Sequence, residues 1–377
     1  MIAHRPLSTV ELRKQNRNRV YRYLIGQWKP VTKQELAFQL SMSLPTLTQN
    51  LNELTEMGLI DRSITTDSTG GRRPRLIVPL PNARFALGIE LTNRDLRIVA
   101  INLRKETLAS RRVALPFAND ETYGEELAGL IEQFLDNNQL DRDRLLGVAM
   151  TLPGIVGPDQ KTIEYAPTIG VDTSTPCRFL DRIPYRVLLD NDATCGGFGE
   201  WWNRTDQPSM VYLSLNRGVG GAILVDGKLY DGVDHRAAEF GHICLHPGGR
   251  PCQCGRKGCL EAYCSTARLS DDLDISLEVF FQRLEDGDIQ CQALWDSYLK
   301  DLAHGIMIIH TILDCPIMIG GQMSQYLPAY RSRLQWLVRD LCSPGDRVDF
   351  LAFCPSSGHS VCIGAATRLL YEFVKQL

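Results

Sequence analysis

The 377-residue sequence predicts a two-part protein in which a small helix-rich module precedes an α/β body. The first observation is an alternation of strand-like and helix-like segments from Phe85 onward, which is typical of α/β folds. The second observation is charge: residues 1–80 carry 12 Lys and Arg against 6 Asp and Glu, whereas the remainder carries 29 against 38. A basic segment on an acidic body indicates a polyanionic partner for the N-terminal module alone.

The N-terminal module, predicted over residues 1–80, contains three successive helices. Apolar residues at helical spacing indicate the first, which ends before Pro30; they are Leu12, Val20, Tyr23 and Leu24. Thr32 followed by Glu35 is a capping box that starts a second, short helix. Pro45 suits the first turn of a third helix, which ends at Gly58. This order is that of a helix-turn-helix.

The third helix and the segment after it carry side chains suited to DNA. Small polar residues on the predicted exposed face can hydrogen-bond base edges in a major groove; they are Thr46, Thr48, Gln49 and Asn50. Two short strands around a Gly/Arg turn predict a wing whose Arg72, Arg73 and Arg75 would reach phosphates or a minor groove. The module resembles the winged helix-turn-helix of bacterial transcription regulators. The alternative is a helical module that docks onto a protein.

The body begins with a predicted hairpin, whose strands start at Phe85 and Leu96. A helix over residues 121–137 and a buried strand from Leu145 follow, and the strand leads into the turn Pro153-Gly154. Near the C-terminus, residues 314–321 are predicted to form a strand and a glycine turn, and Gly364 opens a last helix. These elements make the body an α/β domain.

A cluster of potential metal ligands lies within 18 residues, and its members are His242, Cys252, Cys254 and Cys259. One imidazole and three thiolates form a complete tetrahedral set, so the cluster predicts one structural zinc ion per chain. Four glycines allow this Cys-rich loop, residues 242–259, to fold around an ion. Cys244 and Cys264 could each replace one ligand, although the loop favours the set named. The alternative is four residues without a shared role.

The composition places the protein in a cellular compartment. No apolar run approaches the roughly 18 residues that a membrane span needs, so no membrane insertion is expected. The N-terminus lacks the apolar core of a secretion signal, and the 12 Cys show no regular disulfide spacing. These features predict a protein of the reducing cytoplasm.

Several motifs together resemble the ROK family, which contains repressors and sugar kinases. The most specific are Glu239-x-Gly241-His242, the cysteine cluster through Glu261, and Asn191-Asp192-Ala193; Pro153-Gly154 and Gly320-Gly321 match weaker motifs. The preceding winged helix matches the repressor branch. The resemblance implies an actin/hexokinase-like, ribonuclease H-like body over residues 81–377. Its two lobes would comprise residues 81–190 with 360–377, and residues 191–359.

The same resemblance implies a sugar site. In the family, the Asn-Asp-Ala motif supplies a sugar-binding Asn and an Asp that acts as general base, here Asn191 and Asp192. It also places Glu239, His242 and Glu261 at the sugar, with one nitrogen of His242 on zinc and the other toward the sugar or its neighbours. Two departures, Thr168 and Thr194 at positions where the kinases often have Asn, leave the sugar's identity open.

The ATP site implied by the kinases is eroded. Their first strand ends in Asp-x-Gly-Gly-Thr, whereas this chain has Glu90-Leu91-Thr92-Asn93-Arg94, which places side chains where phosphates would lie. The second phosphate loop has lost its first Gly and its Thr, and reads Asn216-Arg217-Gly218-Val219-Gly220-Gly221-Ala222. The sequence therefore predicts a regulator without a catalytic residue, in which Asp192 is a vestigial base.

The resulting hypothesis is a sugar-responsive transcriptional regulator, a repressor of carbohydrate uptake or catabolism genes. A homodimer, possibly paired into a tetramer, would bind operator DNA through its two winged helices, and a sugar or sugar phosphate would be the effector. Two alternatives stay open: an ATP-dependent sugar kinase with an appended DNA-binding module, and a regulator controlled by a protein partner.

Overall fold

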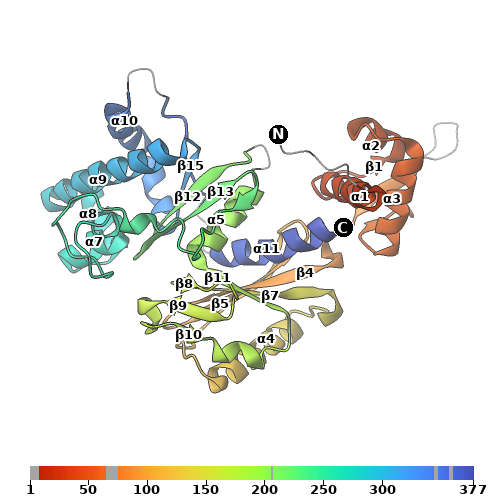
Figure 1. Ribbon diagram of the computed structural model, residues 1–377, viewed down its shortest axis with the longest axis horizontal. Coiled ribbons are helices and arrows are strands. Elements are labelled where there is room, and N and C mark those ends of the chain that lie inside the picture. Colours follow the sequence, from red (N-terminus) through yellow and green to blue (C-terminus); the bar gives the residue numbers. More distant parts are fainter. Residues whose placement is uncertain (1–7, 65–74, 205–206, 344–346, 356–359) are drawn as a thin grey trace.

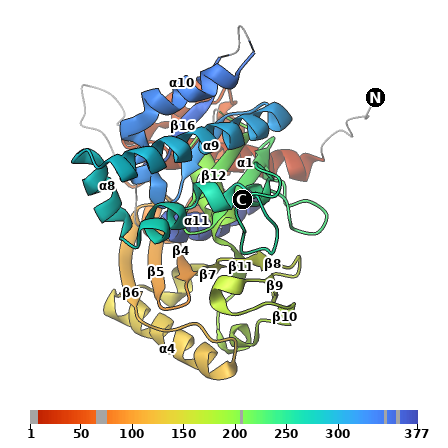
Figure 2. The ribbon, with the colours of Figure 1, turned by 90° about the vertical axis from the view of Figure 1, so that its left-hand side faces the viewer.

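The computed structural model describes residues 8–64, 75–204, 207–343, 347–355 and 360–377. A small N-terminal module sits beside a body of two lobes, each built on a five-stranded sheet (Figure 1). The layers run from α4 through the first sheet to α11 and α5, and then through the second sheet to α9 (Figure 2). Residues 65–74, which include Arg72 and Arg73 and most of the predicted wing, lie outside the described residues.

The N-terminal module has three helices and a small sheet with strand order β1-β3-β2. Its elements are α1 Thr9–Ile25, β1 Val31–Thr32, α2 Lys33–Gln39, α3 Leu44–Glu56, β2 Ile60–Asp61 and β3 Leu76–Pro79. The capping box at Thr32 and Glu35 is present, and Gly58 adopts a left-handed φ of 68° just beyond α3. The expected core position of Leu12 is wrong, because that side chain is 48% exposed. Tyr21 is fully buried in its place, one turn from Leu24.

The first lobe contains a mixed sheet with strand order β11-β7-β4-β5-β6. Its strands are β4 Phe85–Leu91, β5 Leu96–Asn102, β6 Thr107–Val113, β7 Leu145–Leu152 and β11 Val187–Asn191. Alternate side chains face opposite layers: Leu87 and Ile89 meet α4 (Glu121–Asn137), whereas Ala86 meets α11 (Ser360–Gln376). A short sheet of β8 Ile155–Val156, β9 Thr162–Tyr165 and β10 Thr175–Pro176 follows β7.

The second lobe contains a sheet with strand order β14-β13-β12-β15-β16. Its strands are β12 Met210–Leu215, β13 Val219–Val225, β14 Lys228–Leu229, β15 Ile317–Gly320 and β16 Leu351–Phe353. One face packs against a helical layer, and the other packs against α5 (Asp192–Trp202). The remaining helices are α6 Glu261–Cys264, α7 Thr266–Ser270, α8 Leu277–Glu285, α9 Ile289–Leu313 and α10 Arg331–Leu341.

Helices α5 and α11 cross between the two sheets at glycines. A Cβ atom on Gly199 would lie 2.6 Å from the Gly364 Cα, and one on Gly364 would lie 2.1 Å from the Cys195 carbonyl oxygen. Only glycine permits this approach of the two backbones. Gly364 thus serves the contact inside α11, and the expectation that it opens the helix is wrong. The last helix accordingly begins at Ser360, earlier than expected.

Short 3-10 turns connect several of these elements. They are η1 Pro81–Ala83, η2 Arg142–Arg144, η3 Pro167–Ile169, η4 Arg178–Arg182, η5 Phe240–His242, η6 Asp271–Leu273, η7 Gln322–Gln325 and η8 Leu327–Tyr330. Among the described helices, none combines the length and the apolar character that crossing a bilayer requires.

Candidate functional site

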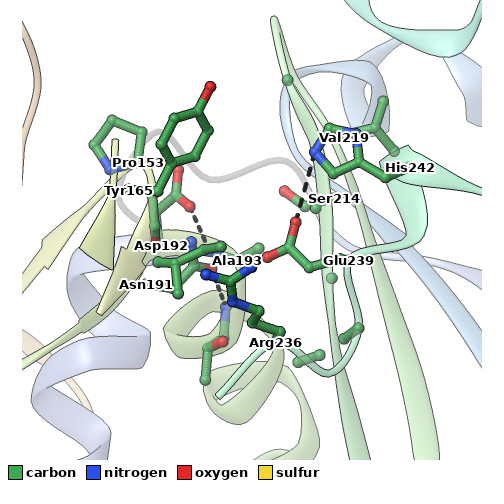
Figure 3. Close-up of a pocket in the computed structure, with 18 of the residues that line it drawn as sticks. Pro153, Tyr165, Asn191, Asp192, Ala193, Ser214, Val219, Arg236, Glu239 and His242 are labelled. Carbon is green, nitrogen blue, oxygen red and sulfur yellow. Dashed lines mark hydrogen bonds and ion pairs between the residues drawn. The ribbon is translucent and has the colours of Figure 1, made fainter. Parts of the chain in front are cut away.

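A cavity of about 950 Å³ opens between the two lobes, at the carboxyl ends of β7 and β11 and beside the β12–β13 turn. Its walls bring together Asn191, Asp192, Glu239, His242 and Glu261, the whole set expected around a sugar. They come from three separate stretches of the chain and line one cleft; Figure 3 shows Asn191, Asp192, Glu239 and His242 there. Clefts at the carboxyl ends of strands are common binding sites in α/β proteins.

Asn191 holds two segments of the cleft wall together. Its side-chain carbonyl caps α5 by accepting from the Thr194 N–H at 3.0 Å, and its amide donates to the Gly154 carbonyl at 2.9 Å. Each of these atoms retains one further hydrogen-bonding capacity. Asn191 therefore fixes the Pro153-Gly154 turn against α5 and can still offer one donor or acceptor to a ligand.

Asp192 is the first residue of α5 and accepts from the Ala193 N–H at 2.7 Å. The pKa of this carboxyl is raised to about 7, mainly by burial and also by repulsion from Glu90 and Glu239, although the hydrogen bond from Ala193 acts in the opposite direction. A carboxyl that titrates near neutrality can both accept a proton from a hydroxyl and donate one. This property suits recognition of a polyol.

The opposite wall of the cleft presents Glu239 and Glu261. Burial raises the pKa of Glu239, whose Oε2 lies 3.8 Å from Nε2 of His242. Glu261 accepts from the Val219 N–H at 2.9 Å, and its other oxygen lies 3.6 Å from the Cys252 sulfur. Glu261 thus joins the β12–β13 turn to the Cys-rich loop. The oxygen that accepts from Val219 has a structural role and is not free for a ligand in full.

The geometry of the Cys-rich loop fits a tetrahedral metal ion. The ligand atoms of His242, Cys252, Cys254 and Cys259 all lie within 4.8 Å of one another. The Cys252 sulfur lies 3.8 Å from His242 Nδ1, and the Cys254 and Cys259 sulfurs are 3.8 Å apart. Zinc–sulfur bonds of about 2.3 Å at tetrahedral angles place two sulfurs about 3.8 Å apart. These four residues would hold the ion, and neither Cys244 nor Cys264 belongs to the group.

His242 connects this centre to the cleft. Its Nδ1 faces the thiols and its Nε2 faces Glu239 (Figure 3). A ligated histidine commonly gives its second nitrogen to a carboxylate, which fixes the ring. The loop that would hold the ion therefore also orients one wall of the cleft.

Side-chain hydrogen bonds hold the two loops that were compared with phosphate loops in the sequence. The Asn216 amide donates to Ser214 Oγ at 3.1 Å, and its carbonyl accepts from the Gln322 N–H at 2.6 Å. The Thr92 hydroxyl donates to the Asp95 carbonyl at 2.9 Å and closes the other loop. The Asn216 side chain thus ties its loop to β12 and to Gln322, and the Thr92 side chain ties its loop to Asp95.

Sequence reasoning missed Arg236 and Asp190, which also line the cleft. Figure 3 shows Arg236 reaching into the space between Asp192 and Glu239. The neighbouring His235 and Ala238 adopt left-handed φ values of 52° and 62°, which non-glycine residues rarely do. No motif marks an arginine placed by an irregular loop. Asp190, adjacent to Asn191, could have been found from its position at the end of a strand.

Helix α3, the expected recognition helix, carries the predicted DNA-contacting residues at different degrees of exposure. Gln49 is exposed and lies against the Arg13 guanidinium, and Thr46 and Thr48 are half-buried. The expectation that Asn50 lies on the exposed face is wrong, because Asn50 is 2% exposed and donates to the Thr46 carbonyl at 2.8 Å. The helical turn rotates this position toward Leu47 and Leu51, so Asn50 is removed from the DNA-contacting set. Arg75 is exposed at the start of β3.

Comparisons with known proteins agree with this architecture. The ROK family model matches residues 86–367. The transcriptional dual regulator NagC of Escherichia coli K12 is 31% identical over 267 residues, which cover 70% of this chain and 66% of that protein. The xylose repressor of Bacillus subtilis is 23% identical over 65% of this chain and 64% of its own length. The chain thus spans just under two thirds of the length of these curated relatives.

Solved structures share the fold. A ROK family transcriptional regulator described as a homologue of the Escherichia coli MLC protein aligns with a TM-score of 0.78 at 23% identity, covering 97% of both chains. The ROK hexokinase of Thermus thermophilus aligns with a TM-score of 0.65 at 22% identity, covering 77% of this chain and 99% of that one. The regulator's match extends over the N-terminal module, whereas the hexokinase's match leaves about a quarter of this chain uncovered.

Proposed function

This chain belongs to the ROK family, and from that premise we propose that it is a sugar-responsive, DNA-binding transcriptional regulator. The observation that carries the proposal is the combination of an N-terminal module of three helices and a small sheet with a carboxylate-lined cleft between the two lobes of the body. Relatives named as a regulator and as repressors support the same reading. The effector is a sugar or sugar phosphate, and the DNA target is an operator.

The sugar half of the proposal rests on the cleft. Asp192, Glu239 and Glu261 present carboxylates from opposite walls, and carboxylates bind pairs of sugar hydroxyls by accepting their hydrogens. The ion in the Cys-rich loop is proposed to be one structural Zn²⁺ per chain. Bound zinc would lock the loop, because all four positions are filled by protein ligands.

The DNA half rests on the N-terminal module. Helix α3 would enter a major groove with Thr46, Thr48 and Gln49, while Arg75 and the wing arginines Arg72 and Arg73 contact the backbone. Two modules of a homodimer would read the half-sites of a pseudo-palindrome, and pairing of dimers would give a tetramer.

A thermal-shift screen tests the effector. The full chain loaded with zinc is heated with glucose, N-acetylglucosamine, xylose and the 6-phosphates of the two hexoses. A ligand at 100 times its Kd stabilises the native state by about 2.7 kcal/mol, which is readily measured. A hit that also changes DNA affinity supports the proposal. Unchanged melting across the panel together with intact DNA binding would instead favour control by a protein partner.

Kinase activity is expected to be absent. Transfer of a phosphoryl group depends on backbone groups and Mg²⁺ held around the phosphates, and Asn216 and Thr92 fill those loops with side-chain contacts. A coupled assay for ADP release with MgATP and each sugar of the panel should give no signal above the no-sugar control. Turnover that disappears in Asp192→Asn would establish the enzyme alternative.

Replacing Arg75 with alanine is expected to weaken DNA binding at every sequence. Removing one cation from a phosphate reduces the slope of log Kobs against log salt by about 0.9. Fluorescence anisotropy with a random-sequence duplex at four salt concentrations measures this slope. The matched control is Arg111→Ala, which removes another exposed arginine, on β6 of the body. An unchanged slope in Arg75→Ala, or an equal change in Arg111→Ala, contradicts the wing assignment.

A further inference from the structure

The N-terminal module and the C-terminal helix share one hydrophobic core. Val20, Tyr21 and Leu24 of α1 belong to the same buried cluster as Val374 of α11 and Leu377, which directly follows that helix. Figure 1 shows the end of α11 lying against α1. Because close-packed side chains transmit a displacement to their neighbours, a movement of α11 would displace the N-terminal module.

Polar interactions strengthen the same junction. The Arg17 guanidinium donates to the Leu377 carbonyl, and the Asn18 amide donates to the Val374 carbonyl. These carbonyls lie at the C-terminal end of α11, where a helix offers its carbonyls no N–H from a following turn. Side chains of the module therefore complete the hydrogen bonding of a helix that belongs to the body.

The same helix reaches the cleft. Arg368, in the middle of α11, forms an ion pair with Asp190, and the two side chains are only 15% and 20% exposed. Asp190 lines the cleft and directly precedes Asn191 and Asp192. A ligand hydroxyl that approaches Asp190 competes with Arg368 for the same carboxylate. Since a largely buried cation needs its partner, Arg368 responds to that competition.

Helix α5 makes a second connection between the same two places. Its first residue is Asp192, and its last, Trp202, lies beneath the Arg22 guanidinium of α1 at 5.0 Å from the ring centre. The Trp202 ring also meets Tyr371 of α11 edge-on at 4.8 Å. At Gly199 and Gly364 the backbones of α5 and α11 are in direct contact, so a displacement of one helix there displaces the other.

From these interactions we propose that α11 and α5 form the mechanical connection through which the occupied cleft repositions the DNA-binding module. At the cleft, the connection begins with the ion pair between Asp190 and Arg368. At the DNA-binding module, it ends in the interactions that Arg17, Asn18 and Arg22 make with α11, Leu377 and α5. The proposal rests on the proposed function. Coupling of two sites requires an element whose state both sites bias, and this helix pair touches both.

The first experiment needs no ligand. Hydrogen exchange of the full-length chain is compared between wild type and Asp190→Asn, which breaks the ion pair with Arg368. Exchange in α1 and in the last turn of α11 should rise about threefold or more, while exchange in the buried strand β12 stays unchanged. The control is Asp271→Asn, which breaks the Arg217 ion pair at the cleft mouth without touching α11. Equal exchange in α1 for wild type and Asp190→Asn overturns the proposal, as does a uniform rise that includes β12.

The second experiment measures coupling with the same sugar panel. Arg22→Gln and Trp202→Leu should bind the stabilising sugar as wild type does but lose at least about half of its logarithmic effect on DNA affinity. Arg19→Gln, which removes the same charge from the same helix, should keep the full effect. A full effect in both Arg22→Gln and Trp202→Leu overturns the proposal. If no sugar acts on wild type, the proposed effector fails while hydrogen exchange still decides the connection.

Discussion

Cys254→Ser is expected to release the metal from the protein and to destabilise the second lobe. Three cysteine sulfurs and one imidazole converge within 4.8 Å, and a serine hydroxyl cannot complete a zinc-thiolate set. Structural zinc sites contribute about 10–16 kcal/mol of apparent binding free energy in isolated fingers, and part of that holds this loop. Metal analysis should fall from one ion per chain to well under half, with a melting temperature lower by several degrees.

The matched control is Cys244→Ser, which makes the same change to an exposed cysteine on the same loop. This variant should keep its metal and its melting temperature. Full metal content in Cys254→Ser would refute the four-ligand centre, and metal loss in Cys244→Ser would place a different cysteine in the ligand set.

The metal centre also has an expected consequence for the effector. His242 Nδ1 faces the thiols while Nε2 faces Glu239, so the position of the cleft wall depends on the loop. Cys254→Ser should therefore lose the thermal shift given by the stabilising sugar while DNA affinity without sugar stays near wild type. DNA affinity that collapses together with the sugar response would point to global unfolding instead.

Features that depend on residues close together in the sequence could be predicted from it. The ligands of the Cys-rich loop lie within 18 residues, so their spacing alone predicted the cluster that the structure brings together. The capping box at Thr32 and the helix over residues 121–137 depend on neighbouring residues and were likewise predictable. The family resemblance, carried by short motifs, assembled the cleft from distant segments.

Features that depend on tertiary packing could not be predicted in this way. Asn50 and Gln49 are adjacent polar residues, and only the rotation of α3 against α1 decides that the first is buried. The Asp190–Arg368 pair joins residues far apart in the sequence, and neither position has a recognisable spacing. Arg236 enters the cleft because His235 and Ala238 adopt left-handed backbone conformations that their side chains do not favour.

Asp192→Asn is expected to stabilise the protein above pH 7 and to leave its stability nearly unchanged near pH 4. Burial is the main cause that raises the pKa of Asp192 from its usual 3.8 to about 7, with repulsion from Glu90 and Glu239 added. Between these two values the folded state holds a proton that the unfolded state has released. Wild-type stability therefore falls as pH rises through this window and is lowest, with respect to this group, above pH 7.

Asparagine removes that penalty because it carries no charge at any pH. One unit of pKa corresponds to about 1.4 kcal/mol, so the gain above pH 7 has an upper limit on the order of 4 kcal/mol. Melting temperatures of both proteins are measured from pH 4 to 8.5. Asp271→Asn provides a control of opposite sign. Hydrogen bonding from Ser270 and the ion pair with Arg217 lower the pKa of Asp271. Replacing this stabilised carboxylate should therefore destabilise the protein at neutral pH.

A difference between wild type and Asp192→Asn that does not vary with pH would mean that folding does not change the ionisation of Asp192 over this range, and would contradict the raised pKa. The expected profile instead identifies a carboxyl kept at the point of ionisation inside the cleft. Burial deprives the Asp192 carboxylate of hydrogen bonds from water. A sugar hydroxyl that donates to this carboxylate replaces such a bond, and the binding free energy becomes more favourable by that amount. The energetic cost of burying Asp192 is then a source of ligand affinity, and Asp192→Asn should bind the stabilising sugar more weakly although it is the more stable protein.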